Sequence, residues 1–450
     1  MSDSVVQRAV AAHQAGRLKE AERGYRAALA QEPDRAELHF VLGQVLCGLG
    51  QLDAAVRHFQ ESHRLRPDLP EAAIQLCNEI EARGDGATAM ALLRGMVARN
   101  PEDAGAWVNL GIMLARQRDF APALDSYRRA QAIAPDFALA HYNEARLHLV
   151  TGDLAQGWAK AEWRLKLDLA EQLPPGFNQP RWAGAPFSGT LLLHAEQGFG
   201  DTIQFCRYVK LAARRARILL SVPPPLLRLL SRLDGVAEFV QPGRPIPAFA
   251  RYCSLMSLPH IFGTVLETIP AEIPYLSAEP AARDAWRQRL AGLKGLKVGL
   301  VWAGGAAQPN RPDAARADAR RSIPLAAFAP LAGLADFVSL QKGAPAAQAP
   351  PAGMVLHDFT TELNDFADTA ALIEALDLVI SVDTAVVHLA GALGKPVWLL
   401  NRYDTCWRWL LGRDDSPWYP TLRQFRQTAP GDWAPVIAEV ASALAAKSQL

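Results

Sequence analysis

The chain has 450 residues, with 47 basic and 46 acidic side chains and a formal net charge of +1. This length is too great for a single hydrophobic core and predicts two to four domains. The near-zero charge lacks the basic excess that electrostatic binding of nucleic acid requires, so no nucleic-acid partner is expected. The five cysteines are widely spaced and indicate reduced, mostly buried thiols, with no metal and no cofactor.

The N-terminal segment is amphipathic and lacks the apolar stretch of a signal peptide. No uncharged apolar run approaches about 18 residues, the length that a membrane-spanning helix needs. We therefore expect a soluble, cytoplasmic protein without an integral membrane segment.

Residues 1–170 contain a 34-residue period. Prolines, alanines, large side chains and Leu-Gly or Leu-Cys pairs each recur at this spacing. They are Pro33, Pro67, Pro101 and Pro135; Ala21, Ala55, Ala89 and Ala123; Tyr25, Phe59, Leu93 and Tyr127; and Leu42-Gly43, Leu76-Cys77 and Leu110-Gly111. Small residues let paired helices approach closely, and each proline ends the second helix of a pair. A unit with this pattern is similar to the tetratricopeptide repeat, and a fifth, degraded unit extends to about residue 167.

One row of amides follows the same period. Gln75, Asn109 and Asn143 lie on the first helix of each pair, the helix that lines the concave groove of such an array. Amides both donate and accept hydrogen bonds, which suits the backbone of an extended peptide, so we expect a protein partner in the groove. The alternative is that a solvent-filled groove simply tolerates polar residues. In both cases these side chains should face solvent.

The remainder of the chain changes character. Residues 171–189 are rich in proline and glycine and predict a linker. Beyond the linker, short apolar runs alternate with helical stretches, which favours parallel sheets with crossover helices. One series occupies residues 190–280 and a second occupies 281–450, so we expect two Rossmann-like lobes with a cleft between them. Ligands of such sheets bind beyond the carboxyl ends of the strands, where helix N-termini point.

The first lobe contains a glycine loop, GFGD, after the strand expected at 190–195. The loop holds Gly198 and Gly200 and ends in Asp201, at a predicted helix start. A full G-x-G-x-x-G is absent and no acid closes the second strand, which disfavours dinucleotide binding. Two interpretations of Asp201 remain open: a helix cap, or a carboxylate that faces the cleft and acts as a general base.

The second lobe contains the stretch SVDTAVVHLAGALGKPVWLL at residues 381–400. Asp383 and Thr384 follow an expected strand and begin the next helix, where free backbone N–H groups and the helix dipole favour an anion. His388 lies four residues after Thr384 and therefore on the same face. The alternative makes Asp383 or Thr384 a helix cap and His388 a packed core histidine.

Four stretches of the second half resemble bacterial tetratricopeptide-repeat proteins with a heptosyltransferase-like, family 9 glycosyltransferase domain. They are EQGFGDTIQFCRYV, RRSIPLAAFAPL, DFADTAALIEALDLVISVDTAVVHLAGALGKPVWLL and WRWLLGRDDSPWYPTLRQFRQ. The order of repeats and catalytic unit also resembles that of the O-GlcNAc transferase family. The resemblance implies an α plus α/β fold. A tetratricopeptide superhelix (1–170) would precede a GT-B unit with an N-terminal acceptor lobe (190–280) and a C-terminal donor lobe (281–450).

Heptosyltransferase-like enzymes of this family are inverting GT-B enzymes that need no metal. The resemblance implies that Asp201 is the catalytic base and that the D-T-x-x-x-H block contacts the nucleotide and phosphates of a nucleotide-sugar donor. The donor-binding residues that it implies are Asp383, Thr384, Ala385, His388, Gln341, Lys342, Arg321 and Ser322. This sequence departs from its relatives at Gly305, where asparagine is usual, and in the alanine-rich insertion that follows. It departs again at NRYDTCWRW.

Together these features predict a hexosyl- or heptosyl-type glycosyltransferase whose repeats recruit a protein acceptor. Two alternatives remain open. One is a saccharide- or lipid-directed transferase, and the other is a repeat scaffold whose GT-B unit binds nucleotide without turnover. A metal-dependent GT-A enzyme is disfavoured, because Asp318 lies amid alanines and Asp414-Asp415 has the wrong spacing for a D-x-D motif.

Overall fold

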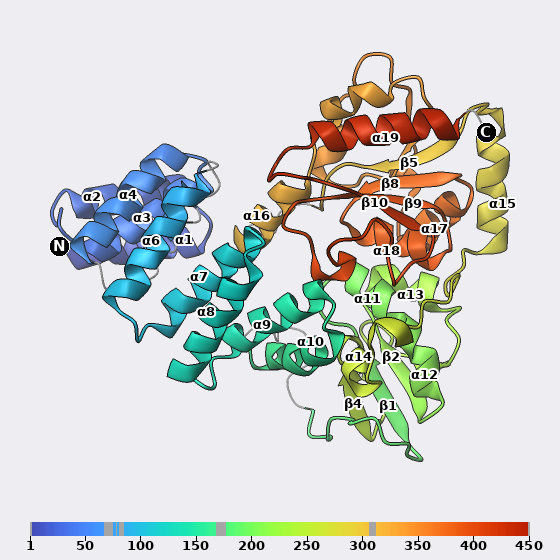
Figure 1. Cartoon of the computed structure of the whole chain (residues 1–450), viewed down its shortest axis with the longest axis horizontal. Coiled ribbons are helices and arrows are strands. Elements are labelled where there is room, and N and C mark those ends of the chain that lie inside the picture. The colour runs from blue at the N-terminus through green and yellow to red at the C-terminus, as the bar shows by residue number, and fades with distance from the viewer. Residues whose placement is uncertain are drawn as a thin grey trace. The chain divides into compact units, whose positions relative to one another are not determined.

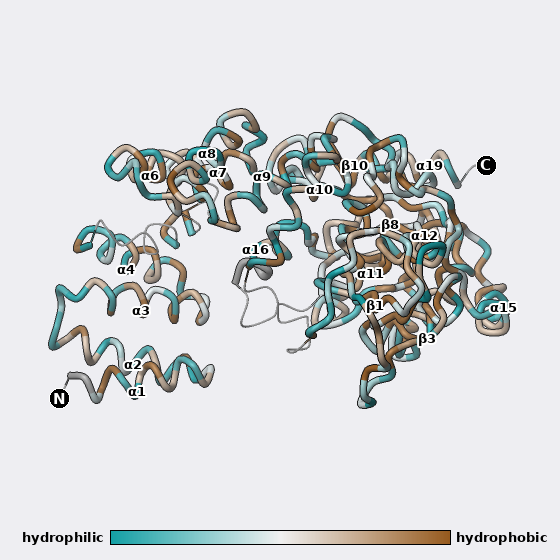
Figure 2. The backbone as a smooth tube through the Cα atoms, turned by 90° about the horizontal axis from the view of Figure 1, so that it is seen from below, coloured by the Kyte–Doolittle hydropathy of each residue, from teal (hydrophilic) through white to brown (hydrophobic). Residues whose placement is uncertain are grey.

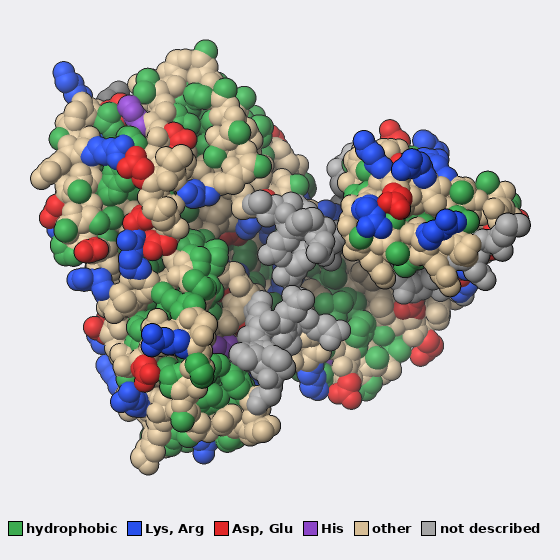
Figure 3. Space-filling view, turned by 180° about the vertical axis from the view of Figure 1, so that it is seen from behind, with side chains coloured by type: hydrophobic (Ala, Val, Ile, Leu, Met, Phe, Trp, Pro, Cys, Tyr) green, Lys and Arg blue, Asp and Glu red, His purple; other side chains and the backbone are tan. Residues whose placement is uncertain are grey.

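The computed structural model describes residues 2–66, 75–77, 79–80, 85–167, 177–305 and 312–448 (Figure 1). The chain forms two compact units, Met1–Glu144 and Ala145–Leu450. Among the helices within the described ranges, none combines the length and apolar character needed to cross a membrane. On the face seen in Figure 3, the described basic and acidic side chains are largely interspersed, in keeping with the net charge of +1.

The first unit consists of paired helices. Its described helices are α1 (Ser2–Gln14), α2 (Leu18–Leu29), α3 (Ala36–Gly48), α4 (Leu52–Leu65), α6 (Gly86–Arg99), α7 (Ala104–Arg116), α8 (Phe120–Ile133) and the start of α9 (Ala138–Thr151). They alternate between hydrophobic and hydrophilic residues along their length, as amphipathic helices do (Figure 2). The predicted Pro67 lies outside the described residues, whereas Pro33, Pro101 and Pro135 each follow the second helix of a pair.

A contact between glycine and an aromatic ring explains the 34-residue period. A Cβ atom at Gly43 would lie 2.6 Å from Phe59 Cε1, and one at Gly111 would lie 2.5 Å from Tyr127 Cε1. The third repeat has the larger Cys77 and the smaller Leu93 at these positions, and both are buried. The 34-residue spacing of these positions therefore follows from the close contact between the two helices of each repeat.

The second unit begins with the end of α9, followed by α10 (Leu154–Ala161) and the 3-10 helix η1 (Glu162–Lys166). The first lobe has a parallel four-stranded sheet in the order β3-β2-β1-β4. Its strands are β1 (Thr190–His194), β2 (Arg217–Ser221), β3 (Val236–Phe239) and β4 (Arg251–Ser254). Its helical elements are α11 (Phe199–Phe205), η2 (Cys206–Tyr208), α12 (Val209–Ala213), α13 (Pro224–Leu230), η3 (Leu255–Ser257), α14 (Leu258–Ile261) and η4 (Leu266–Thr268). The helix expected after the glycine loop is thus interrupted by a 3-10 turn.

The second lobe has a parallel six-stranded sheet in the order β10-β9-β8-β5-β6-β7. Its strands are β5 (Lys297–Val301), β6 (Asp336–Ser339), β7 (Leu356–Asp358), β8 (Leu378–Val382), β9 (Val397–Asn401) and β10 (Leu422–Arg426). Its helices are α15 (Pro280–Arg289), α16 (Pro312–Arg321), α17 (Phe366–Glu374), α18 (Ala385–Ala392) and α19 (Ala434–Lys447). Its 3-10 helices are η5 (Leu290–Gly292), η6 (Leu325–Leu331), η7 (Ala344–Ala347), η8 (Thr360–Glu362) and η9 (Trp407–Trp409).

The predicted fold class is confirmed, because a helical repeat region precedes two parallel-sheet α/β lobes in a GT-B-like arrangement. All residues of β8 and β9 are buried, as expected for inner strands of a parallel sheet that is covered on both faces. The apolar runs of β8 and β9 are long enough to predict both strands from the sequence. Strands β4, β7 and β10 were not predicted, since they are short or interrupted by polar residues.

Candidate functional site

The glycine loop of the first lobe and the D-T-x-x-x-H block of the second lobe are in contact. Helix α11 begins after β1 and α18 begins after β8, so both start beyond the carboxyl end of a parallel strand. A Cβ atom at Gly200 would lie 2.8 Å from His388 Cδ2 and 3.5 Å from Ala385 Cα. A side chain at position 200 would push the two helices apart. Glycine at this position therefore lets the predicted base and the predicted donor block lie together.

Asp201 makes two charge-assisted contacts. Its Oδ2 accepts a hydrogen bond from the backbone N–H of Gly198, the N-cap residue of α11, at 3.0 Å. Its Oδ1 forms an ion pair with Nη2 of Arg408, which belongs to η9 of the second lobe. Asp201 therefore caps its own helix with one oxygen and joins the two lobes with the other.

Arg408 is nearly buried, and its other nitrogen atoms are also bound. Nε donates to Gln204 Oε1 at 2.8 Å, and Nη1 donates to Cys406 Sγ at 3.0 Å. Burial disfavours its charge, but Asp201, Cys406 and Asp383 lie close enough to raise the pKa of the guanidinium above its usual value. Arg408 is thus electrostatically coupled to acids of both lobes.

The N-terminus of α18 has no side-chain cap among the described residues. Thr384 is the N-cap residue, yet its hydroxyl makes no capping bond and lies 3.2 Å from Ser381 Oγ. In contrast, the N-cap of α17, Asp365, accepts from the N–H groups of Ala367 and Asp368 at 2.8 and 3.0 Å. The first turn of α18 therefore has no side-chain cap from the described residues for its backbone N–H groups, and an uncapped helix N-terminus of this kind favours an anion.

The segment that contains Arg321 and Ser322 lies beside this N-terminus. Arg321 donates from Nη1 to the carbonyl oxygen of Asp383 at 2.8 Å and from Nε to Asp318 Oδ1 at 2.8 Å. Ser322 Oγ accepts from the N–H of Gly304 at 3.1 Å and donates to the carbonyl of Asp318 at 2.8 Å. The structure therefore brings Arg321 to Asp383, and it uses Ser322 to hold the loop that follows β5.

Gln341 and Lys342 hold neighbouring loops. Gln341 is buried, and its Oε1 accepts from the N–H groups of Trp302 and Ala303 at 3.1 and 2.9 Å. Lys342 Nζ donates to the carbonyls of Thr360 and Leu363 at 2.5 and 2.8 Å. Within the described residues, neither side chain has a hydrogen bond to the D-T-x-x-x-H block.

His388 has the surroundings of a packed histidine. It is 4% exposed, its Nδ1 lies 2.9 Å from the hydroxyl oxygen of Tyr419, and its ring stacks on Trp409 with centroids 5.2 Å apart. Burial, followed by the charges of Arg408 and Arg207, holds the pKa of His388 well below its usual value. The imidazole is therefore neutral near pH 7. Its contact with a donor stays a prediction.

The structure adds two arginines that the sequence patterns did not mark. Arg408 is 207 positions from its partner Asp201, and no local pattern reports such a contact. Arg207, in η2, is buried at the junction of the lobes and donates to the carbonyls of Trp418 and Pro270 at 2.8 and 3.2 Å. The motif WRW and the arginine that follows FC are the available signals, but an arginine beside aromatic residues in the sequence does not indicate which distant carboxylate or carbonyl it meets.

The amide row belongs to the first unit and makes local contacts. Asn109 Nδ2 donates to the carbonyl of Gly105 at 2.7 Å, and Asn143 Nδ2 donates to that of Leu139 at 2.9 Å, each within its own helix. Gln75 and Asn109 are partly exposed, but Asn143 is 7% exposed, so the expectation that all three face solvent is wrong for Asn143. An intrahelical bond uses one of the two N–H groups of the Asn143 amide. The groove role of the row stays a prediction.

Three protein-family models match the chain. Models described as tetratricopeptide repeat match residues 12–79 and 81–136, and the model of glycosyltransferase family 9 (heptosyltransferase) matches residues 361–405. The last match covers α17, β8 and α18, including the whole D-T-x-x-x-H block.

The chain is also similar to individual proteins. Protein FlbA of Caulobacter vibrioides is 26% identical over an alignment 507 positions long, gaps included, which covers 97% of this chain and 83% of FlbA. A tetratricopeptide protein of Thermus thermophilus, TTC0263, is 19% identical over 38% of this chain and 93% of its own, with a TM-score of 0.33. MamA of Desulfovibrio magneticus is 20% identical over 37% of this chain and 92% of its own, with a TM-score of 0.30.

The tetratricopeptide-repeat models and the family 9 model match separate parts of one chain. The repeats account for the periodic helices of the first unit, and the family 9 match falls on the segment that meets the glycine loop. The chain therefore combines tetratricopeptide repeats in its N-terminal region with a glycosyltransferase family 9 domain at its C-terminus.

Proposed function

We propose that this chain is a metal-independent, inverting glycosyltransferase that moves a hexosyl- or heptosyl-type sugar from a nucleotide-sugar donor to a hydroxyl group. The acceptor is a protein that the repeats recruit. The observation that carries the proposal is the contact between the first turns of α11 and α18, with Gly200 against His388 and Ala385. This contact supports a single site that combines the carboxylate of one lobe with the uncapped helix N-terminus of the other.

The reaction requires a base and a site for the leaving group. The acceptor oxygen bonds to the anomeric carbon while the bond from that carbon to the nucleotide diphosphate breaks, and Asp201 takes the proton of the hydroxyl. The N–H groups of the first turn of α18 stabilise the departing phosphates. Of the two cations predicted to assist, Arg321 donates to Asp383 beside that turn, whereas Lys342 donates to Thr360 and Leu363.

Arg408 couples binding of the nucleotide-sugar donor to the availability of Asp201 as the base. Its ion pair with Asp201 occupies the oxygen that must accept the proton, because the other oxygen caps Gly198. A donor diphosphate near Asp383 offers the guanidinium a second anionic partner. Donor binding then draws Arg408 toward the phosphates and frees Asp201 for the acceptor.

The variant Asp201→Asn tests the chemistry. We expect nucleotide binding to survive, because the donor block belongs to the other lobe, and transfer to fall on the order of 10²–10⁴-fold as the base is lost. A thermal-shift panel of nucleoside diphosphates and nucleotide sugars first identifies the donor, and product formation is then measured. Asp365→Asn is the matched control, because Asp365 also caps a helix and pairs with an arginine of the other lobe, Arg228, at 2.8 Å.

Near-normal turnover by Asp201→Asn would show that Asp201 is not the general base. If Asp365→Asn lowers turnover as much as Asp201→Asn does, the loss comes from a weakened contact between the lobes and not from loss of the base. Nucleotide binding by the parent chain without turnover of any sugar would favour the alternative of an inactive scaffold.

A triple variant of the amide row tests the protein acceptor. Replacing Gln75, Asn109 and Asn143 with Ala removes groups whose hydrogen bonds to a peptide contribute roughly 0.5–1.5 kcal/mol each. We expect KM for the protein acceptor to rise while donor binding and donor hydrolysis are retained. Because Asn143 is buried, its single variant is measured for stability alongside. An unchanged acceptor KM would favour the saccharide- or lipid-directed alternative.

A further inference from the structure

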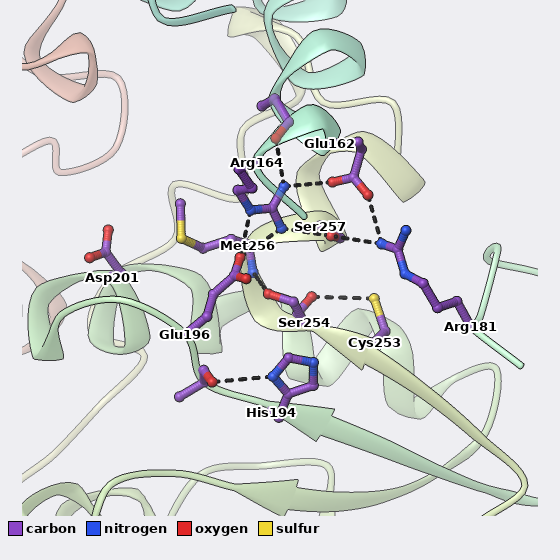
Figure 4. A network of polar contacts seen from close by, with 12 residues as sticks. Glu162, Arg164, Arg181, His194, Glu196, Asp201, Cys253, Ser254, Met256 and Ser257 are labelled. Carbon is purple, nitrogen blue, oxygen red and sulfur yellow. Dashed lines mark hydrogen bonds and ion pairs between the residues drawn. The ribbon is translucent and has the colours of Figure 1, made fainter. Parts of the chain in front are cut away.

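A network of charged and polar side chains includes Glu196, which lies just before the glycine loop in the sequence (Figure 4). At its centre is Arg164 of η1, whose side chain is 3% exposed. Its Nε donates to Glu196 Oε1 at 2.7 Å, Nη1 to Glu162 Oε1 at 2.8 Å, and Nη2 to Ser257 Oγ at 2.8 Å. Every nitrogen of the guanidinium therefore has an acceptor. A buried charge with complete pairing fixes the backbone segments that supply its partners.

Glu196 connects this network to the glycine loop. It follows β1 by two positions and precedes Gly198 by two, and Gln197 between them has a φ of +61°, which is unfavourable for a residue with a side chain. The loop is thus held at both ends by arginines from outside it. Arg164 binds Glu196 at one end, and Arg408 binds Asp201 at the other.

Residues 154–167, which include Arg164, also contact η9, the 3-10 helix that carries Arg408. Trp158 of α10 is buried and meets the rings of Phe205, Trp407 and Trp418 edge-on, with centroids 6.0, 5.2 and 6.3 Å apart. Phe205 ends α11, and Trp407 directly precedes Arg408. Residues 154–167 therefore support both arginine contacts of the loop, although they follow directly on the repeat-like helix α9.

We propose that Arg164 is a positioning residue for the transfer reaction, and that the segment 154–167 sets the glycine loop so that Asp201 meets α18. This inference rests on the proposed function of Asp201. The end of the repeat array would then contribute to the geometry of the active site in the acceptor lobe, in addition to connecting the repeats to that lobe. Arg164 acts through Glu196 on the loop, and among the described residues it makes no hydrogen bond or ion pair with the donor block of the second lobe.

Kinetics of Arg164→Met test the proposal. We expect kcat for transfer to fall on the order of 10–100-fold, the range for a small displacement of a catalytic group. The Kd for the nucleoside diphosphate should stay unchanged, because the donor block is in the other lobe. Arg164→Lys should recover part of kcat, since an ammonium can still pair with Glu196. Arg181→Met is the matched control, because Arg181 donates to Glu162 and Ser257 at 2.7 and 3.4 Å but not to Glu196.

Loss of Arg164 alone takes the arginine away from the half-buried Glu196 and leaves Glu162 with Arg181, and an uncompensated charge at Glu196 can prevent folding. The double variant Arg164→Met/Glu196→Met removes the charge pair and keeps apolar volume. We expect it to fold, with kcat still as low as in Arg164→Met, because the loop has lost its anchor. Wild-type kcat in the folded double variant would overturn the proposal and reduce the pair to a stabilising contact.

Amide hydrogen exchange of residues 195–201 separates this inference from the proposed function. Exchange should speed up in Arg164→Met and in the double variant, and it should stay at the wild-type rate in Arg181→Met. An unaltered exchange rate in the folded Arg164 variants would overturn the positioning role. If the parent chain turns over no nucleotide sugar, the proposed function fails while hydrogen exchange still decides whether Arg164 holds the loop.

Discussion

At the scale of single residues, the candidate site depends on how closely two helices approach. Gly200 lies in α11 against the imidazole of His388, and Asp201 follows directly. Glycine is otherwise unfavourable within a helix by roughly 0.5–1 kcal/mol relative to alanine. Its presence here is explained by the space it leaves for α18. The cost in helix propensity is offset by the contact that joins the lobes.

The variant Gly200→Ala should therefore be destabilising. A methyl group 2.8 Å from His388 Cδ2 forces the helices apart, and we expect a loss of about 1–3 kcal/mol in the free energy of unfolding together with a clear fall in transfer. The matched control is Gly95→Ala in α6, where a Cβ meets no atom within 4 Å. That variant should be neutral or more stable. Thermal unfolding and turnover of both variants check this, and a stable, active Gly200→Ala would refute the close contact.

At the scale of elements, α17 and α18 differ in how they begin. Asp365 caps α17 with two hydrogen bonds, whereas Thr384 makes no capping bond to α18. Both helices start with residues that are strongly preferred as caps. The sequence alone therefore could not distinguish a cap used for stability from an N-terminus left open to a ligand.

Substitution of the two N-cap residues should have opposite consequences. Asp365→Ala loses the bonds to Ala367 and Asp368 and an exposed ion pair with Arg228, so unfolding should become easier by roughly 1–2 kcal/mol. Thr384→Ala should change stability by less than about 0.5 kcal/mol, because no capping bond is lost. It should instead weaken binding of the nucleoside diphosphate. Titration calorimetry and chemical unfolding measure the two effects, and equal loss of stability in both variants would contradict the assignment.

At the scale of the whole molecule, the compact units do not follow the repeats. The predicted repeat domain ends at residue 170, whereas the second unit begins at Ala145 and includes α10 and η1. The reason is packing. Trp158 contacts aromatic rings of both lobes, and Arg164 pairs with Glu196, so this segment belongs to the core of the second unit.

Two truncated chains test this division. A chain that begins at Ala138, the start of α9, should fold and bind nucleoside diphosphate, while it loses transfer to a protein acceptor. A chain that begins at residue 171 removes Trp158 and Arg164, exposes the aromatic rings and leaves Glu196 unpaired. We expect it to be insoluble or to unfold at a much lower temperature. Equal solubility and melting temperature of the two chains would show that the segment is dispensable.

The sequence by itself determined the repeat architecture, the two lobes and the loops that carry Asp201 and the Asp383-Thr384 pair. These features are local, since a 34-residue period, an apolar run and a glycine turn each record contacts between residues close in the chain. Only the tertiary structure decided that Arg408 binds Asp201, that Arg164 binds Glu196 and that His388 is buried against Trp409. The two ion pairs join residues 207 and 32 positions apart, and which charges meet depends on how separate elements pack.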